Sequence, residues 1–120
     1  MARTVLVVDD DASFRCLARR ILNEWGHEVV GEAGSVAEAL DRAAELGPEI
    51  ALIDIGLSDG DGFTLTERLR VTASPPVVVL ISSDGDRANR PAALRAGAVA
   101  FFPKRELPGR ALRGIFERGQ

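Results

Sequence analysis

Five short apolar segments alternate along this chain with five segments in which apolar residues recur at helical spacing. The apolar segments, which we expect to be strands, are Arg3–Asp9, His27–Ala33, Ile50–Asp54, Val77–Ile81 and Ala98–Phe102. An apolar, partly β-branched run bounded by turn residues is typical of a buried strand in a parallel sheet. Because strand–helix–strand crossovers are right-handed, this alternation predicts an α/β fold whose parallel sheet is covered on both faces. Two doubly wound strand orders compete, and five strands favour the order 2-1-3-4-5.

The helical segments have their own start and stop signals. We expect helices over about residues 14–25, 36–46, 62–71 and 89–97, with a last helix that Pro108 opens. Leu17 and Ala111 are among the residues expected to face the core, whereas Arg15, Arg19 and Arg20 of the first helix are expected to face outward. Pro91 disturbs the fourth helix, because proline is tolerated only in a first turn, so residues 84–90 are predicted to be a loose approach.

Composition limits the classes of protein to consider. At 120 residues, with 46% hydrophobic and 28% charged, the chain is the size of one globular domain. Cys16 is the only cysteine, so no internal disulfide can form, and no apolar stretch approaches the roughly 20 residues that span a bilayer. We therefore expect a cytoplasmic protein with no membrane partner. Residues 1–86 hold 16 acidic and 7 basic side chains, whereas residues 87–120 hold 2 and 8. The basic end indicates either a nucleic-acid patch or exposed helix faces carrying arginines, and we favour the second.

Polar side chains end four of the five predicted strands. They are Asp9 and Asp10, Asp54, Ser82 and Lys104. Because the carboxyl ends of parallel strands meet at one edge of the sheet, we expect these groups to share a crevice. Clustered carboxylates repel unless one is protonated or a cation lies among them, and oxygen ligands suit Mg²⁺. A metal and a lysine around a nucleophilic Asp54 are what phosphoryl transfer to that carboxylate requires. Taken singly, each residue would more often be a helix cap or a surface charge.

These residues resemble the receiver domain of response regulators in bacterial two-component signalling, over essentially the whole chain. The motifs that carry the resemblance are Val7-Val8-Asp9-Asp10, Leu52-Ile53-Asp54 with Asp61-Gly62, Leu80-Ile81-Ser82, Ala96-Gly97-Ala98 and Phe102-Pro103-Lys104. The resemblance implies a flavodoxin-like (βα)5 fold with strand order 2-1-3-4-5. It also implies that residues 1–120 form one receiver domain without an output domain, so that DNA would be reached only through a domain absent here.

The resemblance assigns a role to each residue at the strand ends. Asp54 would accept a phosphoryl group from a sensor histidine kinase or a phosphotransfer protein. Mg²⁺, or Mn²⁺ in its place, would be bound directly by Asp10, Asp54 and the backbone carbonyl of Gly56, and by Asp9 through water. Ser82 and Lys104 would take up phosphoryl oxygens after transfer. Such a domain is not an enzyme with a separate substrate, although it assists its own phosphorylation and dephosphorylation.

Phosphorylation is expected to switch one face of the domain. Phe101 matches the family's aromatic position that turns inward when the hydroxyl of Ser82 moves. The face would be formed by the fourth helix, the fifth strand and the last helix, and it would bind a partner or a second copy of the chain. Its basic residues are Arg87, Arg90, Arg95, Arg105, Arg110 and Arg113. Arg105 stands where many family members have proline, which leaves the isomer of the Lys104–Arg105 bond open.

Three other interpretations compete. A haloacid-dehalogenase-like phosphohydrolase would have its nucleophile after the first strand and a second aspartate two residues on, where this chain has Gly56. A flavin-binding electron carrier would need a phosphate-binding loop where three aspartates, residues 9–11, follow the first strand. A pseudo-receiver, an interaction module that phosphorylation does not control, is the alternative that the Pro91 and Arg105 departures keep open.

Overall fold

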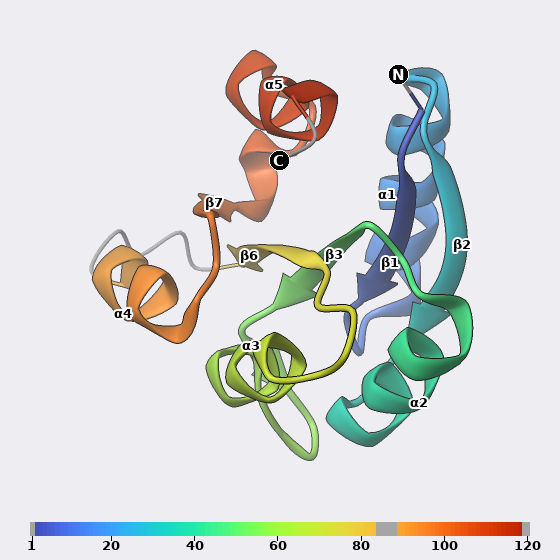
Figure 1. Cartoon of the computed structure of the whole chain (residues 1–120). Helices are drawn as coiled ribbons and strands as arrows, with labels where there is room; N and C mark the ends of the chain where they lie inside the picture. Colours follow the sequence, from blue (N-terminus) through green and yellow to red (C-terminus); the bar gives the residue numbers. More distant parts are fainter. Residues whose placement is uncertain (1, 84–88, 119–120) are drawn as a thin grey trace.

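The computed structural model describes residues 2–83 and 89–118. A five-stranded parallel sheet with the order β2-β1-β3-β6-β7 forms its centre (Figure 1). The strands are β1 (Thr4–Val8), β2 (Glu28–Ala33), β3 (Ile50–Asp54), β6 (Val77–Ser82) and β7 (Ala100–Pro103). Two further strands, β4 (Gly56–Leu57) and β5 (Gly60–Asp61), pair only with each other in a small hairpin. Counted along the main sheet, the order is the predicted 2-1-3-4-5.

The central strands are buried on both faces, which explains why β1, β3 and β6 are nearly continuous apolar runs. Every residue of β3 is buried. Val5 and Val7 of β1 point into one core cluster with α1 and α5, whereas Leu6 and Val8 point into the other with α2, α3 and α4. This alternation is the period of two that a strand imposes on its side chains. The two clusters therefore form the layers on either side of the sheet.

Side-chain caps fix where the first three helices begin. The five helices are α1 (Ala12–Glu24), α2 (Val36–Leu46), α3 (Gly62–Arg70), α4 (Asn89–Ala96) and α5 (Arg110–Arg118). Asp11, Ser35 and Asp61 each accept a hydrogen bond from a backbone N–H in the first turn of the helix they precede. Gly47 caps the end of α2, and its φ of 56° is the left-handed conformation that glycine adopts easily.

The last helix does not begin where the sequence predicts. Residues Lys104–Glu106 form a short 3-10 helix, and the fully buried Leu107 then anchors the chain. Pro108 consequently lies in an exposed turn, and α5 begins two residues later, with Arg113 N donating to Gly109 O. Leu17 and Ala111 are also exposed, contrary to prediction, because α1 and α5 present only a narrow stripe to the sheet.

The described part of the fourth helix, Asn89–Ala96, lies within the predicted range, and Asn89 is the first residue described after position 83. Most of the predicted loose approach, residues 84–88, lies outside the described residues, as does Arg87. The Lys104–Arg105 peptide bond is trans. Across the described ranges, no helix combines the length and apolar character needed to cross a membrane.

Candidate functional site

Three carboxylates meet at the carboxyl edge of the sheet. Asp9 and Asp10 follow the end of β1, and Asp54 is the last residue of β3, its neighbour in the sheet. One carboxylate oxygen from each lies within 4.8 Å of the others. Asp9 is fully buried and Asp54 nearly so, whereas Asp10 is exposed. The structure thus brings together the three acidic residues that the sequence analysis singled out.

Lys104 supplies the positive charge at this cluster. Its Nζ lies 2.7 Å from Oδ2 of Asp9 and 3.5 Å from Oδ2 of Asp54. The same Nζ lies 4.5 Å from the centre of the Phe14 ring in α1, within the range of a cation–π contact. This role of Phe14 was not predicted, because its helical spacing indicates only a core residue.

The pKa values follow from this crowding. Burial, and then the charge of Asp9, raise the pKa of Asp54 to about 6, against the opposing influence of Lys104 and the Gly56 N–H. Burial alone would lower the pKa of the Lys104 ammonium, but the carboxylates of Asp9 and Asp54 outweigh burial and raise it. The site therefore holds one carboxyl group that titrates close to neutrality.

The cluster has the features of a hard-cation site. Oδ1 of Asp9 accepts a hydrogen bond from Asp11 N at 2.9 Å. Oδ2 of Asp9 is buried and accepts no hydrogen bond of standard geometry from the described residues, although Lys104 is its ion-pair partner. A buried, incompletely satisfied oxygen among three carboxylates suits a divalent cation with oxygen ligands, such as Mg²⁺. The donor residues therefore fit the metal that the sequence predicts.

An open cavity of about 460 Å³ joins these residues to the ends of two further strands. It is lined by Asp10, Asp11, Asp54, Ile55, Gly56, Ser82, Ser83 and Lys104. Ser82, at the end of β6, is buried and lies in register with Pro103, the residue before Lys104. Gly56 lies at the base of the β4–β5 hairpin. The four strand ends that the sequence predicted to converge do so.

Phe101 lies away from this cavity, within the core. It is 2% exposed and belongs to the cluster between the sheet and α2, α3 and α4. In this structure Phe101 is therefore a packed core residue.

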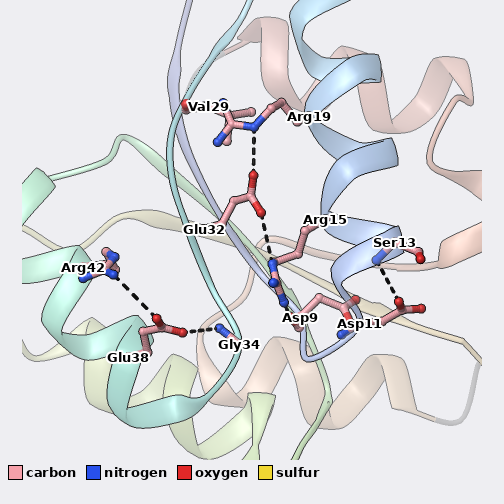
Figure 2. A network of polar contacts seen from close by, with 10 residues as sticks. All are labelled: Asp9, Asp11, Ser13, Arg15, Arg19, Val29, Glu32, Gly34, Glu38 and Arg42. Atoms are coloured by element: carbon pink, nitrogen blue, oxygen red, sulfur yellow. Dashed lines mark hydrogen bonds and ion pairs between the residues drawn. The ribbon is translucent and has the colours of Figure 1, made fainter.

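A polar network beside the acidic turn was not predicted. Arg15 and Arg19 of α1 were expected to face solvent, but both bind Glu32 of β2 (Figure 2). Arg15 also donates a hydrogen bond to the backbone carbonyl of Asp9 at 2.6 Å. Burial would raise the pKa of Glu32, but hydrogen bonds from the two arginines outweigh it and lower the pKa. The sequence signal for this network was a charged residue, Glu32, inside a predicted strand, together with the arginines of the helix before it.

The β4–β5 hairpin has a second unpredicted contact. Asp59 accepts hydrogen bonds from Val36 N at 2.7 Å and Ala37 N at 3.2 Å, at the start of α2. These bonds lower the pKa of its carboxyl group. The tip of the loop that follows Asp54 is thus tied to a neighbouring helix.

Comparisons with known proteins agree with this geometry. The family model described as the response regulator receiver domain matches residues 5–114. The chain is 30% identical over 115 residues to the chemotaxis protein CheY of Thermotoga maritima, covering 96% of both chains. It is 40% identical over 102 residues to a Myxococcus xanthus protein-glutamate methylesterase/protein-glutamine glutaminase, covering 83% of this chain but only 29% of the longer relative. The response regulator domain of Thermotoga maritima CheB superposes with a TM-score of 0.85 at 29% identity, covering 99% of this chain and 97% of that one.

Proposed function

The chain belongs to the family of response regulator receiver domains, and from this premise we propose that it is a phosphoacceptor whose Asp54 is the accepting residue. The donor would be the phosphohistidine of a sensor histidine kinase or a phosphotransfer protein. One observation supports the proposal most strongly. Asp54 lies beside Asp9, Asp10 and Lys104, and it lines an open cavity that also contains the buried Ser82.

Transfer to Asp54 is a nucleophilic displacement at phosphorus. A carboxylate oxygen of Asp54 forms the new bond to phosphorus while the bond from phosphorus to the imidazole nitrogen breaks. The imidazole leaves with the electron pair of that bond, and the product is an acyl phosphate. Because only the ionised carboxylate can attack, a pKa of about 6 leaves most of Asp54 reactive at pH 7.5 but little of it below pH 5.

The acidic cluster would hold the divalent cation for this reaction. Asp10, Asp54 and the Gly56 carbonyl would bind Mg²⁺ directly and Asp9 through water, and Mn²⁺ could replace it. When bound, the cation supplies positive charge that offsets the charge of the transferred group. Lys104 is already within reach of both buried carboxylates, so it could pair with a phosphoryl oxygen without a large movement. The hydroxyl of Ser82 would donate to another phosphoryl oxygen.

The face formed by α4, β7 and α5 would carry the signal to a partner or to a second copy of the chain. The exposed arginines there are Arg90, Arg95, Arg105, Arg110 and Arg113, and the exposed apolar residues include Leu94 and Val99. The acyl phosphate would carry about −1.5 to −2 charges where the ionised carboxylate of Asp54 carries −1, so phosphorylation makes this end of the sheet more negative. Phe101 is already buried in this structure, so phosphorylation would stabilise its inward position and would not have to move the ring in from solvent. Unchanged backbone chemical shifts over residues 89–106 after phosphorylation would contradict this part of the proposal.

In the longer relatives such a domain is part of a larger protein. We propose that this chain acts in the cytoplasm through a kinase and an output partner. It would not turn over a separate substrate. The decisive experiment is intact-mass spectrometry after incubation with a small phosphodonor and Mg²⁺, with Asp54→Ala as the control. One added phosphoryl group on the parent, absent from the variant and from metal-free samples, would support the phosphoacceptor function. No adduct from the small donor or from a phosphorylated kinase would favour the pseudo-receiver, with the α4–β7–α5 face as a constitutive binding surface.

A further inference from the structure

We infer that Arg15 is a positioning residue for the divalent-cation site, because it holds the peptide group between Asp9 and Asp10. The inference rests on the proposed metal site, but it concerns residues that would not touch the metal. Nη1 of Arg15 donates to the Asp9 carbonyl at 2.6 Å, and its Nε donates to Oε1 of Glu32 at 3.1 Å (Figure 2).

The Asp9 carbonyl is a sensitive place to hold. The peptide group is planar, so fixing this oxygen restricts both the last torsion of Asp9 and the first torsion of Asp10. Asp9 is also held through its N–H, which donates to Ala33 O at 2.9 Å, and through Oδ1, which accepts from Asp11 N. The exposed side chain of Asp10 leaves the backbone at this point. Arg15 therefore acts on the direction in which Asp10 presents its carboxylate.

Glu32 and Arg19 in turn hold Arg15. Oε1 of Glu32 accepts from Arg15, and Oε2 accepts from Arg19 Nε at 2.8 Å. Arg19 also donates from Nη1 to Val29 O at 3.2 Å, which ties the network to β2. The planar guanidinium of arginine can donate in two directions at once, to a carbonyl and to a carboxylate, whereas the single ammonium of lysine cannot reproduce that fork. The network thus depends on the shape of Arg15 as well as on its charge.

Charge and position make opposite predictions for Arg15. Its positive charge lies close to the cation site and by Coulomb repulsion would weaken metal binding. If charge were its only effect, removing that charge would tighten the binding of Mg²⁺. If positioning dominates, removing the guanidinium weakens the binding even though a repulsive charge has gone.

The test is calorimetric titration of the unphosphorylated protein with Mg²⁺, which needs no phosphodonor. Arg15→Lys and Arg19→Lys are matched variants: both conserve charge and both remove one guanidinium from Glu32, but only the first replaces the group that donates to the Asp9 carbonyl. We expect Arg15→Lys to raise the dissociation constant roughly tenfold, the lower range for loss of an outer partner of a metal ligand. Arg19→Lys should stay within about twofold, and Arg15→Gln should also bind more weakly than the parent.

A second variant guards against local disruption at Arg15. Glu32→Asp conserves charge but shortens the side chain, so it should weaken Mg²⁺ binding in the same direction by a smaller factor. Urea unfolding of each variant separates the two roles, because a merely structural role would change stability without changing the dissociation constant. Equal Mg²⁺ affinities for Arg15→Lys and Arg19→Lys, or tighter binding by Arg15→Gln, would overturn the inference alone. A parent protein that binds no Mg²⁺ would overturn the proposed metal site and this inference with it.

Discussion

Polar groups are paired differently at the two edges of the central sheet. At the amino-terminal edge, Thr4 N donates to Oε1 of Glu49 at 2.9 Å, and Glu49 N donates back to the Thr4 hydroxyl at 3.0 Å. Arg3 N donates to Nδ1 of His27 at 3.0 Å. At the carboxyl-terminal edge, Asp9 and Asp54 share one ammonium, Lys104, and the pKa of Asp54 rises because both acids are buried together.

The amino-terminal edge therefore serves the stability of the sheet, whereas the carboxyl-terminal edge carries the proposed site at a cost in stability. Reciprocal hydrogen bonds at the first edge link β1 to the start of β3 and stabilise the sheet. Crowded like charges at the second edge oppose folding and persist only because the surrounding sheet is stable. The two edges should therefore respond differently to substitution, to pH and to Mg²⁺.

The largest effect is expected from Lys104→Met. This change leaves two buried carboxylates without their cation, and breaking a buried pair in this way costs on the order of 3–5 kcal/mol of unfolding free energy. Urea unfolding at pH 7.5 without metal measures the loss. Arg105→Met is the matched control, because it removes an exposed charge from the next residue and should change stability by less than about 1 kcal/mol. Equal losses for the two variants would show that the carboxyl edge is not strained by its charges.

The next effect has the opposite sign and comes from Asp54→Asn. A carboxyl group whose pKa rises on folding stabilises the folded state below its unfolded pKa, and that contribution is lost as the pH rises through the folded value. The pKa of Asp54 rises from 3.8 to about 6. The unfolding free energy of Asp54→Asn should thus match that of the parent near pH 4. It should rise above the parent's between pH 4 and 6, and exceed it by up to about 3 kcal/mol above pH 7.

The same pair of proteins tests the cation. Mg²⁺ bound at the proposed site would stabilise the ionised form of Asp54, so adding it should narrow the difference in unfolding free energy between the parent and Asp54→Asn. Urea unfolding from pH 4 to 8, with and without Mg²⁺, gives both results. A difference that does not vary with pH would contradict the raised pKa, and one that Mg²⁺ leaves unchanged would contradict metal binding at Asp54.

The amino-terminal edge should show the reverse dependence on pH. Burial lowers the pKa of His27, against the charge of Glu117, so the neutral ring contributes stability that is lost as pH falls through the lowered value. In His27→Asn, the new side chain retains an acceptor for Arg3 N at the position of Nδ1. It loses the ring contact with Phe116, which should lower the unfolding free energy by about 1 kcal/mol at pH 7.5. Thermal unfolding from pH 7.5 to 5 should show the parent losing more stability than the variant. Parallel curves for the two proteins would remove His27 as the source of acid sensitivity.

Strand order, the acidic cluster, Ser82 and Lys104 could be predicted because each depends on local pattern and on the rule that parallel strands end at one edge. Contacts between distant segments could not. The start of α5 is shifted by the burial of Leu107, and Phe14 lies beside Lys104 only because α1 packs against the same edge. Arg15 was predicted to face solvent because amphipathic spacing describes which stripe is apolar, not which polar residue meets a glutamate on the next strand. Side-chain pairing between elements is thus the information that periodicity lacks.

The smallest effect is expected from Glu49→Gln, which tests whether the amino-terminal edge depends on charge at all. Gln retains an acceptor for Thr4 N and loses only the ion pair with Arg3, whose nearest atoms are 3.6 Å apart and whose Glu49 partner is half-exposed. Exposed pairs of this kind contribute about 0–1 kcal/mol, so the unfolding free energy should change by no more than about 0.5 kcal/mol. The change should be the same with and without Mg²⁺, because the proposed cation site lies at the opposite edge of the sheet. A Mg²⁺-dependent change would mean that the two edges are coupled, and the separation of stability from function would fail.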